Sequence, residues 1–266
     1  MMADDPKLVD AYSAHARGYA DAWSPVIRPL GRRMLAAVPW DGVRWILDVG
    51  TGTGALLPDL RTAAPRAAII GVDPSPVMLQ LARTHGTSLA LMNALQLGIR
   101  AEAIDVVVMA FMLFHLETPE VALAEVRRVL APGGRVGTVT WAEDPDLEAT
   151  RVFEAELDAY GASDPIPIPA SEYSRTNTAQ KMKALFVEAG LEPDKVWIER
   201  FEHRWTLEGF LALRTTFGRT MRKLGSLDAP KREAFRIHVR GRLAALDASA
   251  FLYRAAVVSA VACRPR

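Results

Sequence analysis

The fold of this chain is decided by the stretch Ile46-Leu47-Asp48-Val49-Gly50-Thr51-Gly52-Thr53-Gly54, which is followed by apolar Ala55 and Leu56. A short apolar run meets an acidic residue and then three glycines spaced two apart. This pattern predicts a strand that ends in a tight turn, where a nucleotide-like ligand approaches bare backbone. A Cβ would block that approach, and the helix that follows presents free N–H groups to the ligand.

A second acidic residue ends the next apolar run. Asp73 closes the run that starts at Ala68, and it lies 19 residues after Gly54. An acidic group at that place commonly accepts hydrogen bonds from ribose hydroxyls. The glycine turn and Asp73 together predict a nucleoside site at the edge of a sheet.

Strand-like apolar runs alternate with helical patterns through the first half of the chain, which predicts an α/β fold with a parallel sheet between helices. Two later runs predict a hairpin-like edge of that sheet. The predicted strands are residues 44–49, 67–72, 88–92, 104–110, 135–141, 195–201 and 251–263.

The remaining segments define the expected domain organisation. Residues 1–40 are expected to form N-terminal helices, which in the family named below cover the cofactor site, and residues 41–205 with 248–266 are expected to form the core. Helical periodicity predicts two long helices within 206–247, which would interrupt the sheet edge as a cap. The aromatic residues expected in the core of this cap are Phe210, Phe217 and Phe235.

The composition is that of a globular protein, with 50% hydrophobic and 24% charged residues. The single cysteine, Cys263, excludes an intramolecular disulfide and a thiolate metal cluster, and no metal site is expected. The N-terminus lacks the pattern of a secretion signal, and no apolar run is long enough to span a bilayer. We therefore expect a cytoplasmic protein without a membrane span.

Charge is distributed unevenly along the chain. Residues 200–266 carry a net charge of +9, and the first 199 residues carry −8. A basic segment of this kind suits nucleic acid or an acidic substrate, but it also suits solvated helix faces that acidic residues elsewhere balance. No RNA-binding module is recognisable, which disfavours nucleic acid as a partner.

Four pieces of sequence occur in an order that is typical of one family. They are Ile46–Gly54, Val72–Leu79, Ile104–Val107 and Arg127–Val136. With these pieces the sequence resembles the class I S-adenosylmethionine-dependent methyltransferases, and most of all their small-molecule branch, which includes ubiquinone and menaquinone biosynthesis enzymes. The resemblance implies a Rossmann-like, seven-stranded, mostly parallel sheet with helices on both faces, plus a helical cap.

The resemblance also implies S-adenosyl-L-methionine as cofactor and S-adenosyl-L-homocysteine as product. Asp48 and the backbone of Gly50–Gly54 would hold the methionine part, and Asp73 both ribose hydroxyls. Val77 and Met78 would pack on the adenine face. The residues expected at the cofactor are Asp48, Gly50, Thr51, Gly52, Gly54, Asp73, Pro74, Met78, Asn93, Ala94 and Tyr19.

Asn93 departs from the family pattern. The family usually has an acidic residue there, which contacts the adenine amino group. An asparagine carbonyl still supplies the acceptor that an amino group needs. Asn93 is equally consistent with a turn residue after a strand.

A methyl group on a sulfonium is already activated, so alignment of the acceptor and exclusion of water would be the main catalytic work. His115 is the candidate general base, because it follows the strand 104–110 at the edge where ligands bind. A capping or cofactor-shielding role is the alternative for His115. The candidate acceptor-site residues, each with plain packing as the alternative, are Tyr12, Trp141, His203 and Arg214.

Three functions compete with methyl transfer to a small-molecule substrate on O, N or C. Gly50, Gly52 and Ala55 also fit a dinucleotide dehydrogenase pattern, but a pyrophosphate would be repelled by Asp48. The second is a methyltransferase homologue repurposed for cyclisation or rearrangement, and the third is an RNA methyltransferase. The acceptor, the attacked atom and the choice between monomer and homodimer are left open by the sequence.

Overall fold

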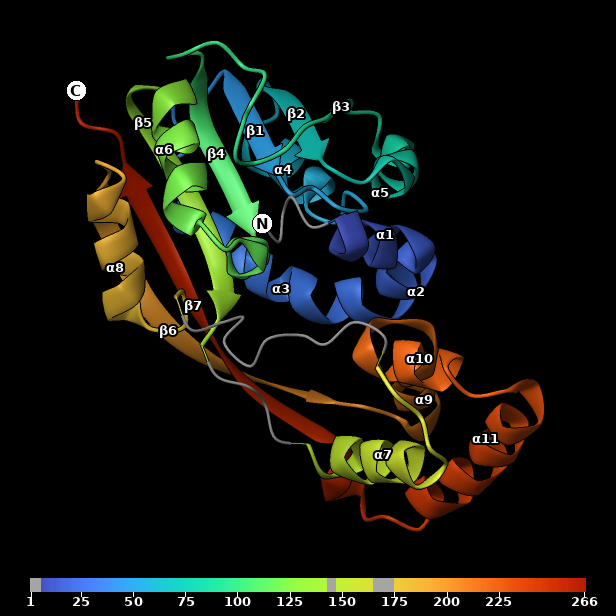
Figure 1. The fold of residues 1–266 in the computed structure, drawn as a ribbon. Coiled ribbons are helices and arrows are strands. Elements are labelled where there is room, and N and C mark those ends of the chain that lie inside the picture. Colours follow the sequence, from blue (N-terminus) through green and yellow to red (C-terminus); the bar gives the residue numbers. More distant parts are fainter. Residues whose placement is uncertain (1–5, 143–146, 165–174) are drawn as a thin grey trace.

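A seven-stranded sheet forms the centre of the molecule, with strand order β3-β2-β1-β4-β5-β7-β6 (Figure 1). The computed structural model describes residues 6–142, 147–164 and 175–266. The strands are β1 (Trp45–Val49), β2 (Ala68–Asp73), β3 (Ser88–Leu91), β4 (Ile104–Ala110), β5 (Leu130–Trp141), β6 (Glu192–Arg204) and β7 (Leu252–Cys263). Strands β1 to β5 pair in parallel, and β7 runs antiparallel to both β5 and β6. The α/β, mostly parallel, seven-stranded sheet predicted from the sequence is therefore confirmed.

The chain reverses its direction of travel across the sheet between β1 and β4. From β1 it proceeds outward to β2 and β3, and it then returns to place β4 and β5 on the other side of β1. Such a reversal leaves a crevice beyond the carboxyl ends of the central strands, where open α/β sheets bind ligands. The glycine turn after β1 lies at this crevice.

Helices cover both faces of the sheet because the central strands are apolar on both faces. On one face Ile46 and Val106 pack against α3 (Ser24–Leu35) and α4 (Leu57–Ala63). On the other face Leu47 and Val107 pack against α6 (Pro119–Val129) and α8 (Ala179–Glu188). Burial of consecutive valines on opposite faces supplies the stabilisation that a doubly covered sheet needs.

Helix α6 differs in one detail from the sequence pattern, in which Val121 belongs to its apolar stripe. Val121 is 42% exposed, and Leu123 is buried instead. The buried positions Ala122, Leu123, Val126 and Val129 follow the spacing of one helical face. The outer face carries Glu125 and Arg128, whose contacts matter below.

The cap contains three helices rather than the two long ones predicted. They are α9 (Leu207–Thr216), α10 (Gly218–Gly225) and α11 (Ala229–Ala244). The backbone is extended at Phe217 and left-handed at Gly218, with φ of +78°, which ends α9 and restarts the chain as α10. Helix α7 (Glu148–Ala159) packs against α10 and α11, as Figure 1 shows.

Acidic residues of α7 and of the segment after it neutralise much of the basic charge of the cap. Glu156 pairs with both His238 and Arg242, each at 3.0 Å. Asp164 lies 3.1 Å from Arg222, and Asp158 pairs with Lys223. Part of the basic excess of the C-terminal segment is thus paired inside the protein, which favours the interpretation of balanced helix faces over a nucleic-acid surface.

The N-terminal segment crosses the carboxyl edge of the sheet as a chain of short helices (Figure 1). They are α1 (Pro6–Ala14), α2 (Ala16–Gly18) and the π-turn η1 (Tyr19–Trp23), which continues into α3. Helix α5 (Pro76–Ala82), which packs against α1 and α2, is followed by the 3₁₀ turn η2 (Arg83–His85). Two further 3₁₀ turns are η3 (Leu113–His115) and η4 (Ala248–Phe251). No helix in the described part of the chain is long and apolar enough to cross a bilayer.

Candidate functional site

The turn after β1 has a backbone that only glycine adopts without strain. Gly50 and Gly52 have φ of +73° and +55°. A Cβ on Gly50 would lie 2.9 Å from the Met112 side chain, whereas a Cβ on Gly52 would meet only the Gly50 carbonyl oxygen, at 4.0 Å. Gly50 is therefore required by packing, and Gly52 leaves open space beside the backbone.

Two buried carboxyls flank this turn. Asp48 accepts a hydrogen bond from the Thr51 hydroxyl at 2.7 Å, and burial raises the pKa of Asp48 to about 6. Asp73 accepts one bond from the Gly52 amide and another from the Ser75 amide, both at 2.9 Å. Burial raises the pKa of Asp73, and these two backbone bonds oppose the rise. Each Asp73 oxygen keeps acceptor capacity for a further donor.

Helix α5 starts directly after Asp73 and fixes the next part of the site. Its N-cap is Ser75, whose hydroxyl accepts from the Met78 amide at 3.2 Å, and Pro76 occupies the first turn. The same Ser75 hydroxyl lies 2.7 Å from the Ser13 hydroxyl of α1. Ser75 therefore fixes the position of Met78 at the site and bonds the N-terminal helix α1 to the start of α5.

A hollow of about 790 Å³ opens at this edge of the sheet, and it gathers most of the predicted residues. It is lined by Val9, Tyr12, Tyr19, Val49, Gly50, Gly52, Asp73, Pro74, Met78, Met92, Ala94, Ala110, Phe111, Met112, His115 and Leu116. An adjoining hollow of about 440 Å³ is lined by Asp48, Thr51, Ser24 and Arg28 among others, and it shares Tyr19, Gly50 and Phe111 with the first. The N-terminal residues Tyr12 and Tyr19 thus form part of the wall of the site.

Tyr12 and His115 meet in the larger hollow although 103 residues separate them in sequence. The Tyr12 hydroxyl lies 3.0 Å from His115 Nε2, and the two rings pack edge to face. The candidate base therefore has a partner that orients its ring.

An aromatic ring of the cap packs against the two tyrosines that line the hollow. Phe217, which the sequence places in the core of the cap, lies edge-on to Tyr12 and Tyr19 with centroid distances of 5.5 and 5.1 Å. Burial and the nearby charge of Asp73 raise the pKa of Tyr19, so its hydroxyl stays protonated. The cap thus reaches the site through one phenylalanine.

Three residues that were predicted at the cofactor, Asn93, Gly54 and Val77, are not among the residues that line the two hollows. The Asn93 side-chain oxygen accepts from the Leu95 amide at 2.9 Å, as expected for a turn residue, while its neighbour Ala94 lines the hollow. A Cβ on Gly54 would contact His85, outside both hollows. Val77 is 39% exposed.

Three candidate acceptor residues also lie outside the described walls of these hollows. Trp141 packs against Phe111, which does line them, with a centroid distance of 5.0 Å. The His203 ring lies 4.3 Å from that of Trp205. Arg214 of α9 donates to the Thr150 hydroxyl of α7 at 2.6 Å, and burial lowers the pKa of Arg214.

Sequence reasoning missed Phe111 and Arg28. Phe111 lines both hollows with a left-handed backbone, φ of +54°, which is uncommon outside glycine. Nothing in the local sequence signals that conformation. Arg28 lines the smaller hollow from α3 and is held by Asp59 through bonds of 2.7 and 3.2 Å.

A mostly parallel sheet with an antiparallel β7, and a glycine turn between two acidic strand ends, define the class I S-adenosylmethionine-dependent methyltransferases. The family profile described as "Methyltransferase domain" matches residues 47–137. A malonyl-[acyl-carrier protein] O-methyltransferase from Geobacter sulfurreducens is 31% identical over 208 residues, which are 74% of this chain and 74% of that protein. The chain belongs to this methyltransferase family, it is a methyltransferase enzyme, and binding of S-adenosylmethionine is typical of its relatives.

Two further comparisons agree with this assignment. A demethylmenaquinone methyltransferase from Thermus thermophilus is 39% identical over 106 residues, 38% of this chain. That match spans about half the length of the relative, 48%. The crystal structure of a protein from Bacillus halodurans, assigned as a methyltransferase, superposes with a TM-score of 0.57 at 17% identity, and covers 89% of this chain and 99% of that one. This likeness concerns the fold alone.

Proposed function

We propose that the protein transfers a methyl group from S-adenosylmethionine to an uncharged apolar or aromatic small molecule that carries an ionisable O, N or C centre. One observation carries the proposal. The Tyr12–His115 pair lines the same hollow as Asp73 and the glycine turn, so the proposed proton acceptor would lie beside the proposed nucleoside site.

The residues present suit the cofactor. Asp73 has acceptor capacity for two ribose hydroxyls, and Gly52 leaves room beside its backbone for the sugar and the thioether. Asp48 and Arg28 line the smaller hollow, where they would face the charged ammonium and carboxylate of the methionine part. Met78, buried at the base of α5, would pack on the adenine.

The cofactor supplies a methyl group on a positively charged sulfur, which is electrophilic without further activation. His115 would take the proton from the attacking atom, with Tyr12 holding its imidazole in place. Tyr12, Tyr19 and Phe217 would exclude water from the reacting centre and fix the acceptor in line.

The walls of the larger hollow favour an uncharged acceptor. Its described lining residues include no lysine or arginine, and its only acidic group is Asp73. A carboxylate acceptor would be desolvated there without a cationic partner. This supports a phenol, hydroquinone or enol over a malonyl carboxylic acid, although the Geobacter relative is named for a malonyl group.

We also propose that the cap at 206–247 selects the acceptor. Phe217, between α9 and α10, contacts Tyr12 and Tyr19, which line the larger hollow, and this contact links the cap to the N-terminal helices. A change in the cap would then alter which acceptor fits while leaving Asp48 and Asp73 undisturbed.

The test is calorimetry with S-adenosylhomocysteine, followed by an acceptor panel of phenols, hydroquinones and a malonyl thioester. Asp73→Ala should abolish binding, whereas Glu102→Gln, which alters a carboxylate paired with Arg264 remote from the site, should not. Turnover of the acceptor without S-adenosylhomocysteine would identify a repurposed enzyme. Undiminished affinity in the Asp73 variant would refute the ribose site.

A further inference from the structure

The loop between β3 and β4 forms one wall of the larger hollow. Met92 and Ala94 line the hollow at the start of this loop. Ala94 and Leu97 are buried, and Leu97 packs in the same apolar cluster as Leu123 of α6. The position of this wall therefore depends on how the loop sits on α6.

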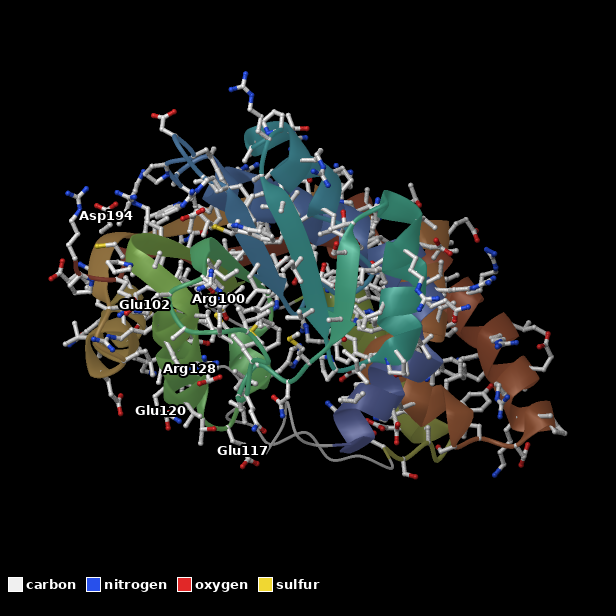
Figure 2. The ribbon with its side chains drawn as sticks, turned by 90° about the horizontal axis from the view of Figure 1, so that it is seen from above. Arg100, Glu102, Glu117, Glu120, Arg128 and Asp194 are labelled. Atoms are coloured by element: carbon white, nitrogen blue, oxygen red, sulfur yellow. The ribbon has the colours of Figure 1, made fainter. Side chains whose placement is uncertain are left out.

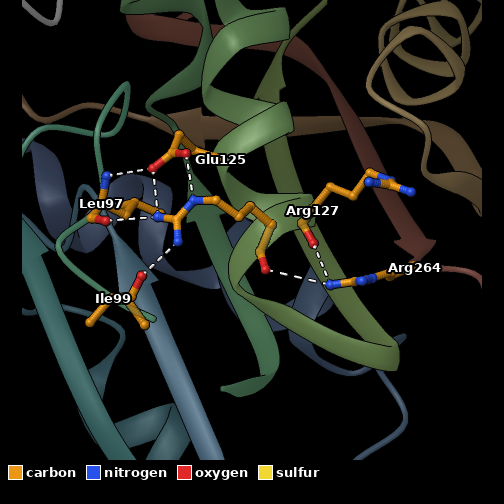
Figure 3. Close-up of polar contacts among 6 residues, drawn as sticks. Leu97, Ile99, Glu125, Arg127 and Arg264 are labelled. Atoms are coloured by element: carbon orange, nitrogen blue, oxygen red, sulfur yellow. Dashed lines mark hydrogen bonds and ion pairs between the residues drawn. The ribbon is translucent and has the colours of Figure 1, made fainter. Parts of the chain in front are cut away.

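Two charged residues of α6 hold the middle of the loop. Arg128 donates from Nη2 to the Leu97 carbonyl and from Nη1 to the Ile99 carbonyl, both at 2.8 Å. Glu125 Oε2 accepts from the Leu97 amide at 2.8 Å. Figure 2 shows Arg128 on the same side of the molecule as Arg100 of this loop, and Figure 3 shows the bonds themselves.

Glu125 and Arg128 also bind each other. Arg128 Nε donates to Glu125 Oε1 at 2.7 Å, and Nη2 donates to Oε2 at 2.8 Å. The hydrogen bond to Arg128 lowers the pKa of Glu125, and the hydrogen bond to Glu125 raises the pKa of Arg128, so both remain charged. We call this pair, with its bonds to Leu97 and Ile99, the loop clamp.

The clamp supplies bonds that the loop does not make to itself. The described loop residues form a tight turn in which Gln96 donates to the Asn93 carbonyl, and Leu95 donates to the Asn93 side chain. Beyond that turn, the amide and carbonyl of Leu97 and the carbonyl of Ile99 are bonded by the clamp. Charge-assisted bonds of this kind are stronger than neutral ones.

We propose that Glu125 and Arg128 are positioning residues for the cofactor, which hold the Met92–Ala94 wall against its adenosyl end. The assignment rests on the proposed cofactor site. Neither residue lines the hollow, so each would act through the loop rather than by contact.

The neighbouring arginine provides a matched control. Arg127 Nε donates to the Gly190 carbonyl at 3.0 Å, between α8 and β6, and Figure 3 shows its side chain directed away from the loop. Both arginines thus bond backbone carbonyls from the same helix, and only Arg128 bonds the loop. Arg128 makes four side-chain bonds and Arg127 makes one, so Arg127→Gln controls for loss of an arginine from this helix and not for the number of bonds lost.

The variants are Arg128→Gln, Arg128→Lys, Glu125→Gln and the control Arg127→Gln. We expect Arg128→Gln to weaken S-adenosylhomocysteine binding about tenfold, which corresponds to about 1.4 kcal/mol. Lysine keeps the charge but has a single ammonium nitrogen in place of the planar fork whose separate nitrogens bond Leu97, Ile99 and Glu125, so Arg128→Lys should lose nearly as much. Arg127→Gln should stay within about twofold of the wild type, because its bond lies outside the loop.

Two readouts separate positioning from general destabilisation. The KM for S-adenosylmethionine should rise in the Arg128 variants while kcat at saturating cofactor is retained. Hydrogen exchange of the Leu97 amide should be faster in Arg128→Gln and Glu125→Gln than in Arg127→Gln, in protein without ligand.

Equal affinities in Arg128→Gln, Arg127→Gln and wild type would overturn the assignment, as would a lower kcat with unchanged KM. If Arg128→Gln fails to fold, Arg128→Lys and Glu125→Gln carry the same test. Absence of heat from the wild-type protein would instead overturn the proposed cofactor site, and the clamp assignment with it.

Discussion

Asp48→Asn removes the charge from a buried carboxyl of the site while it keeps the shape of the side chain. Asp48 is 3% exposed, and burial raises its pKa to about 6 against the opposing hydrogen bond from Thr51. The folded chain therefore binds this proton more tightly than the unfolded chain. It follows that Asp48 contributes most to stability at low pH, and that this contribution is lost as the pH rises from about 4 to about 6.

The size of the effect follows from the two pKa values. A rise from 3.8 to about 6 corresponds to about 3 kcal/mol of native-state stability that is missing at pH 7. Asparagine carries no charge to desolvate, and its side-chain oxygen still accepts from the Thr51 hydroxyl. We expect Asp48→Asn to be more stable than wild type by about 2–3 kcal/mol at pH 7, a rise in Tm of roughly 4–10 °C. Below about pH 4 the two proteins should be equally stable.

The assay is thermal unfolding of both proteins without ligand from pH 4 to pH 8. Asp247→Asn is a control of opposite sign, because the bond from the Ser249 amide lowers the pKa of Asp247, so that variant should lose stability at pH 7. Asp48→Asn should also bind S-adenosylhomocysteine more weakly than wild type. A stability difference that does not change with pH, or an Asp48→Asn protein less stable than wild type at pH 7, would refute the reasoning.

Two other variants test the Tyr12–His115–Phe217 side of the site, and a third tests the ion pairs between α7 and the cap. Tyr12→Phe removes the bond to His115 and keeps the ring, so kcat should fall by about 3- to 10-fold with a shifted pH–rate profile; an unchanged profile would contradict a role for the pair. Phe217→Ala should raise the KM for the acceptor and destabilise the protein by about 1–3 kcal/mol, measured by kinetics and denaturant unfolding; equal KM values would argue against acceptor selection by the cap. Glu156→Gln should cost less than about 1 kcal/mol in denaturant unfolding, because its bond to Arg242 is partly solvated, and a larger loss would mean that the cap depends on that ion pair.

Much of the fold could be predicted because its signals are local. Every predicted strand is present, since apolar runs of strand length and glycine turns report on the backbone that carries them. β6 extends further at both ends than predicted, to Glu192 and Arg204, because its pairing with β7 continues through polar residues that alternate along the edge. The two-helix prediction for the cap failed at Phe217 and Gly218, where a break one residue long is hidden within continuous helical periodicity.

The sequence by itself determined the class of enzyme and the part of the candidate site that is formed by Asp48, the glycine turn and Asp73. Asp48, the glycine turn and Asp73 are set by short-range geometry, because a strand end, a turn and a helix start follow one another along the chain. Only the tertiary structure decided that Tyr12 meets His115, that Phe217 closes over Tyr19, and that Arg128 holds the loop at Leu97. These contacts join distant segments through packing across the sheet and between helices, and no periodicity within either segment encodes the partner that it will meet.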